Sequence, residues 1–399
     1  MTAEAIDLRS QYDKDRQLLR TCESYTYAQL LEIAARRSGL SPLALGRDYM
    51  RLARLGHGIE MSDYVGHQLW DAGLHGEGGA ERYLGSSAHW PIVNRVNDPG
   101  WRHAAEDKLA MRAMFASAGL PQPDTVAMVD ASARRQPGIT KVETPEDLRD
   151  VVRAFPDGAL FVKPVGGMVG LGAMVIERSD DRALTCSGTE PMTYAEFLGD
   201  QARERSYLIQ KRLSNHPDLA PYLTGIATIR FPNFVDGAEI HTPHVAMKVT
   251  TGGNVTCAYW RPGNLAAEID LETGRIVRLA KKTGPISESI PDHPETPGLM
   301  GLRIPFWDEV KALNEAAARL YAPIAYSSTD IAVTPEGPVV VELNYGGSFD
   351  ILQNATGRGL LTDRLRDWLR GRGANIGAAP KGMARVLPFG RGGAGAVRI

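Results

Sequence analysis

The residues best suited to chemistry lie near the C-terminal end of the sequence, in a segment that reads as strand, turn and strand. Residues 335–337 (Pro-Glu-Gly) predict a tight turn, and the apolar run 338–343 that follows is interrupted by Glu342, then ends at Asn344. Because alternate residues of a strand share one face, these two side chains should project together. Pairing across the turn should bring Asp330 near them.

Two carboxylates and an amide oxygen are hard oxygen donors, which suit Mg²⁺ better than zinc. Their burial in an otherwise apolar hairpin carries a desolvation cost unless a cation or hydrogen bonds compensate. The alternative is an edge hairpin whose polar residues face water. The hairpin alone leaves both interpretations open.

A glycine-rich segment lies upstream, between two apolar strands. Lys163 ends the first strand, and the loop after it contains Gly166, Gly167, Gly170 and Gly172. Glycines let the backbone approach a ligand and direct consecutive N–H groups at an anion, and an ammonium beside them could meet a phosphate. The loop lacks the Gly-Lys-Ser/Thr sequence and the following helix of a Walker A or dinucleotide motif. A glycine-rich hairpin with a solvated lysine is the alternative.

Three further segments carry weaker signals. Lys108 stands in the first turn of a predicted helix, where a lysine is usually a solvated charge. Arg230 shares a strand face with Thr228 and suits bidentate contact with phosphate or carboxylate, although a surface ion pair is the ordinary alternative. The segment 207–213 reads as a buried strand that breaks into a connection, which could lend its backbone to a purine edge.

Composition sets the broad class. The chain has 399 residues, enough for two or three domains, and its 45 Lys and Arg against 47 Asp and Glu give a formal net charge of -2. This balance gives no electrostatic argument for nucleic acid or an anionic membrane. Three widely spaced cysteines indicate neither a disulfide framework nor a thiolate metal site. No stretch approaches the roughly 20 apolar residues of a membrane span, so we expect a cytoplasmic protein.

The order of elements suggests four regions. Residues 1–90 read as helices, and strands and helices alternate from residue 91, with a strand predicted at 255–260. Residues 371–399 are rich in Gly, Ala, Arg and Pro, so we expect a poorly ordered tail. Between them we place two units, 91–212 with the glycine loop and 213–370 with the hairpin.

Two lysines, a glycine loop, an apolar hinge, a strand arginine and Asp…Glu-x-Asn, in this order, resemble the ATP-grasp superfamily, and most closely its sugar-transfer-associated branch. The resemblance spans roughly residues 25–370 and rests on the ordered occurrence of short segments. These are Phe161 to Pro164, Gln210 to Leu213 with His216 and Pro217, Thr228 to Arg230, His293 to Thr296, and Glu342 to Asn344 followed by Phe349, Gln353 and Gly357.

The resemblance implies an α+β ATP-grasp fold, with two subdomains that grip ATP behind the helical N-terminal region. Lys108 and Lys163 would contact phosphates under the glycine loop, and Gln210, Lys211 and Leu213 would hold adenine. Asp330, Glu342 and Asn344 would bind two Mg²⁺ ions, with Mn²⁺ as an alternative and Glu342 as the bridging ligand. The family usually has Glu at the position of Lys211, and its Asp-Asn pair is altered here to the stretch 260–264.

The activity implied is a ligase that joins a small-molecule carboxylate to an amine or other nucleophile through an acyl phosphate. Arg230 would steady the acyl phosphate, and His293 would act as base or substrate contact, with a structural histidine in a Pro-rich loop as the alternative. A phosphotransferase acting on a sugar or alcohol, or a scaffold in glycan assembly that has lost catalysis, remain open. The N-terminal helices would shape the pocket or form a homodimer.

Overall fold

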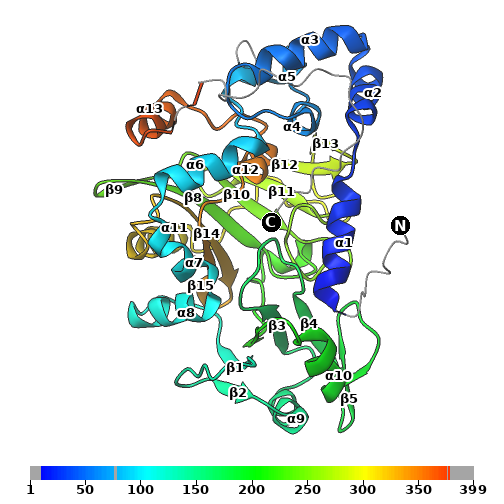
Figure 1. Cartoon of the computed structure of the whole chain (residues 1–399), viewed down its shortest axis with the longest axis vertical. Helices are drawn as coiled ribbons and strands as arrows, with labels where there is room; N and C mark the ends of the chain where they lie inside the picture. The colour runs from blue at the N-terminus through cyan, green and yellow to red at the C-terminus, as the bar shows by residue number, and fades with distance from the viewer. Residues whose placement is uncertain (1–9, 76–78, 375, 378–399) are drawn as a thin grey trace.

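The computed structural model describes residues 10–75, 79–374 and 376–377, and it contains a helical region followed by two mainly antiparallel sheets (Figure 1). This arrangement confirms the predicted α+β class with N-terminal helices. None of the described helices is long and apolar enough to span a membrane. Most of the predicted tail 371–399 lies outside the described residues, so its order stays a prediction.

The helical region begins at α1 and continues through short helices, of which α2 and α3 are well capped. Thr26 starts α2 with a capping box to Gln29, and Ser41 caps α3, whose first residue is Pro42. The apolar faces of these helices pack around Leu45 and Tyr64. The helices are α1 (Gln11–Glu23), α2 (Tyr27–Ser38), α3 (Pro42–Ala53), α4 (Met61–Gly66), α5 (Ala72–His75), α6 (His89–Val96), α7 (Arg102–Glu106) and α8 (Lys108–Ser117).

The first sheet has seven strands in the order β2-β1-β7-β3-β4-β5-β6. The glycine-rich loop joins its neighbouring antiparallel strands β3 and β4, as the sequence predicts. Its elements are β1 (Thr125–Val129), β2 (Thr140–Val142), α9 (Pro145–Arg153), β3 (Leu160–Pro164), β4 (Met174–Ser179), β5 (Ala183–Cys186), β6 (Met192–Thr193), α10 (Tyr194–Glu196) and β7 (Tyr207–Lys211).

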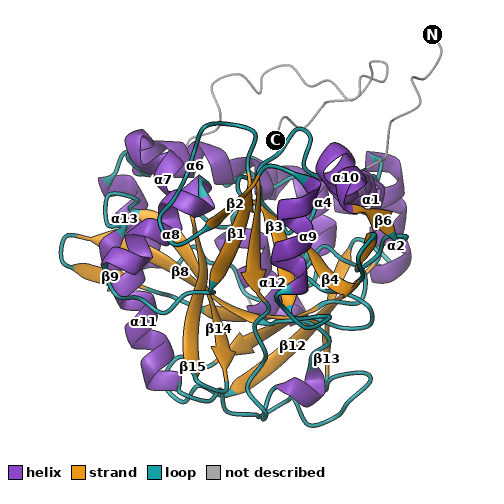
Figure 2. Ribbon diagram, turned by 90° about the horizontal axis from the view of Figure 1, so that it is seen from below, coloured by secondary structure: helices purple, strands orange, loops and turns teal. Residues whose placement is uncertain are grey.

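The second sheet has eight strands, in the order β13-β12-β11-β10-β8-β14-β15 with β9 paired to β8. In Figure 2, β8, β14 and β15 lie on the side of α11, and β12 and β13 lie toward the opposite side. Its elements are β8 (Thr228–Asp236), β9 (Glu239–His241), β10 (Val245–Val249), β11 (Leu265–Ile269), β12 (Ile276–Thr283), β13 (Ile286–Ile290), α11 (Trp307–Leu320), β14 (Tyr326–Thr334), β15 (Gly337–Asn344), α12 (Phe349–Thr356) and α13 (Asp363–Gly371).

The strand predicted at 255–260 is wrong, because these residues belong to a loop between β10 and β11. The buried amide of Asn264 holds the loop together. It donates to the carbonyls of Thr256 and Ala258 at 2.9 Å and accepts from the N–H of Thr251 at 3.1 Å. A side chain thus satisfies backbone groups that a strand would pair with a neighbour.

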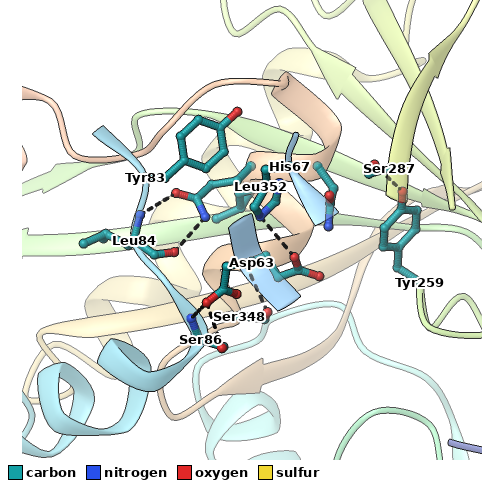
Figure 3. Close-up of polar contacts among 12 residues, drawn as sticks. Asp63, His67, Tyr83, Leu84, Ser86, Tyr259, Ser287, Ser348 and Leu352 are labelled. Carbon is teal, nitrogen blue, oxygen red and sulfur yellow. Dashed lines mark hydrogen bonds and ion pairs between the residues drawn. The ribbon is translucent and has the colours of Figure 1, made fainter. Parts of the chain in front are cut away.

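Two buried amide side chains join the helical region to strand β14 of the second sheet and to helix α12. Asn97 donates to the carbonyl of Tyr326 at 2.9 Å and accepts from its N–H at 2.7 Å. Gln353 of α12 makes the same two-way contact with the backbone of Leu84, both bonds measuring 2.9 Å. Figure 3 shows Leu84 in this interface. The helices are therefore anchored both to β14, the first strand of the hairpin, and to α12.

Candidate functional site

A row of charged side chains crosses the second sheet. Arg230 on β8 lies directly opposite Asp330 on β14, and Asp330 lies opposite Glu342 on β15. Residues opposite each other on paired strands share one face, so the three side chains stand side by side. Lys248 belongs to the same face, because it lies two residues beyond Ala246, the residue opposite Arg230.

Asp330 is the centre of this row and is 1% exposed. The guanidinium of Arg230 donates to its two carboxylate oxygens at 2.9 and 2.7 Å, and Lys248 Nζ donates to Oδ2 at 2.8 Å. Burial alone would raise the pKa of Asp330, but the charges and hydrogen bonds of Arg230 and Lys248 hold it well below its usual range. The carboxylate is therefore ionised and fixes both cations.

Two lysines face this row from the other parts of the molecule. Lys108, at the start of α8, donates from Nζ to the carbonyl of Gly167 at 2.8 Å and lies 3.9 Å from Glu342 Oε2. Lys163, at the end of β3, is buried. Burial, together with the positive charge of Lys108, lowers the pKa of Lys163 to about 8, and Glu342 and Asp330 oppose this shift. The predicted lysines, loop and hairpin therefore meet at one place.

The glycine-rich loop lies between these lysines and the loop 250–264. Gly170 and Gly172 have φ values of +72° and +69°, which favour glycine. A Cβ at Gly170 would lie 3.3 Å from Thr256. Gly166 and Gly167 begin the loop, where Gly167 accepts the bond from Lys108. The glycines thus allow the loop to turn and to lie close to Thr256 in the loop 250–264 of the second sheet.

The predicted hinge for adenine lies at the end of β7. The side chain of Gln210 is buried and donates to Thr125 Oγ1 at 2.9 Å, while the side chain of Lys211 pairs with Asp124 at 2.9 Å. The N–H of Lys211 bonds to the carbonyl of Asp124 at 2.8 Å. Two of the predicted contacts thus use their side chains within the protein, and Leu213 follows at the point where the strand has ended.

The donors predicted for Mg²⁺ are not equally available. Asn344 donates from Nδ2 to the carbonyl of Ser328 at 3.3 Å, which leaves its amide oxygen for another partner, and the side chain of Glu342 is 26% exposed. Asp330 already receives three hydrogen bonds. Within the described ranges, no group of three or more His, Cys, Asp or Glu side chains is arranged to hold a metal ion. Glu342 and Asn344 are therefore the two predicted donors whose oxygens are not already committed as those of Asp330 are.

His293 lies apart from the row in its described contacts. Its Nδ1 accepts from the N–H groups of Glu295 and Thr296 at 3.2 and 3.0 Å, so the ring supports its own loop. Burial lowers the pKa of His293, against the effect of nearby carboxylates. The structure brings Lys108, Lys163, Arg230 and the hairpin together but gives His293 a local role.

Sequence reasoning missed two residues of the site. Lys248 interrupts an apolar strand, which is a signal of the same kind as Glu342 in β15. His89 carries no such signal, because it is an isolated histidine at the start of α6. Burial lowers the pKa of His89 to about 4, assisted by the charge of Arg230 and opposed by the main chain of Gly347. Its Nε2 has no hydrogen-bond partner among the described residues.

Comparison with known proteins identifies the fold. A sequence model of the family described as sugar-transfer associated ATP-grasp matches residues 91–367. The chain belongs to this ATP-grasp family. The matched range includes every residue of the charged row and the glycine loop, whereas α1 to α5 precede it. The search of curated proteins finds no match.

Solved structures similar to this ATP-grasp chain are distant from it. The ligase PsnB complexed with a minimal precursor is 17% identical over 69% of this chain and 64% of its own, with a TM-score of 0.37. The L-amino acid ligase from Bacillus licheniformis is 13% identical over 67% of this chain and 48% of its own, with a TM-score of 0.37. D-alanyl-alanine synthetase A from Vibrio cholerae is 10% identical over 70% of this chain and 68% of its own, with a TM-score of 0.41. The chain thus spans less than two thirds of the length of the first two.

Proposed function

We propose that this ATP-grasp protein is an ATP- and Mg²⁺-dependent ligase that joins a carboxylate to an amine and releases ADP and phosphate. The observation that carries the proposal is the charge of the site. Lys108, Lys163, Arg230 and Lys248 converge on Asp330 and Glu342, so these six side chains carry an excess of two positive charges. Such a site suits a nucleotide polyphosphate together with a substrate carboxylate.

The nucleotide is proposed to lie under the glycine loop, between the two sheets. Lys108 and Lys163 contact its phosphates, with loop N–H groups from Gly166 to Gly172 as further donors. The segment with Gln210, Lys211 and Leu213 holds adenine, and Leu213 offers its main chain because it follows the end of β7. Exclusion of water by the loop matters because an acyl phosphate hydrolyses readily.

Glu342 and Asn344 are proposed to hold Mg²⁺, with Asp330 beside them as the third predicted donor. The metal, when bound, neutralises the charge that develops on the phosphates. The protein's own part is to fix these donors on the rigid strands β14 and β15. Mn²⁺, which also prefers oxygen donors, is the alternative ion.

The chemistry proposed has two steps. An oxygen of the substrate carboxylate attacks the γ-phosphorus, and ADP leaves with the electrons of the broken bond. The amine nitrogen then attacks the acyl carbon, an amide forms, and inorganic phosphate leaves. Arg230 steadies the acyl phosphate by charge and hydrogen bonding. The proton lost by the amine nitrogen goes to the departing phosphate or to water, because the described contacts of His293, the base predicted from the sequence, lie within its own loop.

The test is a screen of carboxylate and amine pairs for ADP release, with the products identified by mass spectrometry. A condensed product together with free phosphate supports the ligase. ADP release with phosphate retained on an acceptor would instead identify a phosphotransferase. Arg230→Gln should lower turnover by about 10²-fold or more if it stabilises the transition state, and an unchanged rate removes it from the mechanism.

A further inference from the structure

Helix α1 lies outside the residues matched by the family, yet it reaches the glycine loop. Figure 1 shows it at one side of the molecule, running from the α2–α5 group toward β4 and α10. Its contacts there are made by the first two turns. A helix that precedes the ATP-grasp domains in sequence therefore lies against the loop of the candidate nucleotide site.

Asp15 makes the central contact. Its side chain is 2% exposed, and its Oδ2 accepts the N–H of Gly172 at 2.9 Å, at the end of the loop. The same oxygen lies 2.8 Å from Arg261 Nη2, in the loop between β10 and β11. Gln11 donates to the other carboxylate oxygen at 3.0 Å. One buried carboxylate thus connects the helix, the glycine loop and the second sheet's loop.

The residues around Asp15 pack the helix tightly in this position. A Cβ at Gly172 would lie 3.0 Å from Cβ of Tyr12 and 3.1 Å from Oη of Tyr207, so glycine is needed for the approach. The guanidinium of Arg205 lies 3.6 Å from the centre of the Tyr12 ring. The N–H of Gln11 donates to Gln201 Oε1 at 2.7 Å. Helix α1 is therefore also held by residues 201–205, in the connection that leads into β7.

Trp260, the residue before Arg261, fixes the tip of the glycine loop at Val169. Trp260 Nε1 donates to the carbonyl of Val169 at 2.9 Å, and the Arg261 guanidinium lies 4.8 Å from the centre of the Trp260 ring. Val169 has a φ of +54°, which is unfavourable for a β-branched residue. A strained backbone persists only where its surroundings fix it. The loop is thus held at its tip by Trp260 and at its end by Asp15.

We infer that Asp15 is a positioning residue for the nucleotide site, which fixes the glycine loop in the conformation that binds phosphates. A loop already ordered before binding loses less conformational entropy when the ligand arrives, so the affinity is higher. Because the loop covers phosphates only if the proposed function is right, the nucleotide part of this role rests on that proposal. The ordering of the loop itself does not.

The experiment compares Asp15→Ala and Asp15→Asn with Lys14→Ala, an exposed change on the same helix. Binding of the ATP analogue AMPPNP with Mg²⁺ is measured by calorimetry, and hydrogen exchange is measured over residues 166–174. We expect Asp15→Ala to weaken binding about tenfold and to speed exchange of the loop in the free protein. Asp15→Asn keeps an acceptor for Gly172 and should have a smaller effect, and Lys14→Ala should have none.

Arg261→Ala tests whether the ion pair carries the effect. If it does, the double variant with Asp15→Ala should bind no more weakly than Asp15→Ala alone. Unchanged affinity and unchanged loop exchange in a folded Asp15 variant would overturn the inference. If Asp15→Ala does not fold, Asp15→Asn carries the comparison.

Lys163→Ala separates this result from the proposed function. Loss of AMPPNP binding in Lys163→Ala but not in the Asp15 variants refutes the role of Asp15 and leaves the nucleotide site standing. If the wild type does not bind AMPPNP, the proposed function fails and the nucleotide role of Asp15 fails with it. Exchange of the loop still shows in that case whether Asp15 orders it.

Discussion

Arg230 and Asp330 face each other across β8 and β14, and the guanidinium donates one hydrogen bond to each carboxylate oxygen. This geometry is the fork-to-fork pairing in which both groups are most rigid. Lys248 adds a second cation to the same carboxylate. Arg230, Lys248 and Asp330 are therefore ordered before any ligand is present, because their mutual contacts within the sheet fix the orientation of the two cations.

Replacement of Asp330 by Ala should destabilise the fold, because it leaves two largely buried cations without their partner. Loss of one member of a buried ion pair typically costs about 3–5 kcal/mol. The free energy of unfolding, from urea titration followed by circular dichroism, measures the effect. Glu342→Gln is the matched control, since Glu342 is half-buried and should cost less than about 1 kcal/mol. Equal losses in the two variants would show that Asp330 does not stabilise this sheet.

Glu342→Gln should instead affect metal-dependent binding. The amide keeps the size of the side chain but loses the charge that a Mg²⁺ ion requires. We expect AMPPNP affinity in the presence of Mg²⁺ to fall by about 10- to 100-fold, while the affinity measured with EDTA stays close to that of the wild type. Calorimetry with and without Mg²⁺ provides both values. If Glu342→Gln retained the full enhancement by Mg²⁺, Glu342 would not be a metal ligand.

Lys163 should make nucleotide binding sensitive to pH. Its pKa of about 8 lies below the usual value for lysine because burial disfavours the charged form. Below pH 8 the free protein carries the ammonium that phosphates bind. Above pH 8 the ammonium is lost from the free protein, and binding must then take up a proton. Affinity should therefore fall about tenfold between pH 7 and pH 9.

A substitution that removes the charge of Lys163 provides the control. Lys163→Met keeps the length of the side chain but cannot titrate, so its weaker binding should lack this fall between pH 7 and pH 9. Calorimetry with AMPPNP at several pH values compares the two proteins. Parallel pH profiles would assign the dependence to another group, such as the phosphates of the nucleotide.

The sequence predicts the parts of this site whose signal is local. The hairpin, the glycine loop and the strand that ends at Lys163 each show alternation, turn residues or an interrupted apolar run, and β14, β15, β3 and β4 form where expected. The contacts of Asp15 and His89 depend on packing between elements far apart in the chain, which no local pattern encodes. Residues 255–260 have strand propensity, but the side-chain amide of Asn264 donates hydrogen bonds to the carbonyls of Thr256 and Ala258. Propensity fails there because a tertiary contact competes for the same hydrogen bonds.

Gln353 gives a last prediction, on the anchoring of the helical region. Its amide bonds to both the N–H and the carbonyl of Leu84 at 2.9 Å, and the residue is 1% exposed. Gln353→Met keeps the length of the side chain but leaves both backbone groups buried without a partner, at about 1–3 kcal/mol each. Unfolding in urea should show a loss of about 2–6 kcal/mol in the free energy of unfolding.

Gln122→Met is the control, since the side chain of Gln122 is half-buried and donates one bond, at 3.0 Å, to the carbonyl of Arg112. A loss in Gln353→Met no larger than in this control would mean that water or a backbone shift satisfies Leu84, and that the helices are held by Asn97 and by apolar packing instead.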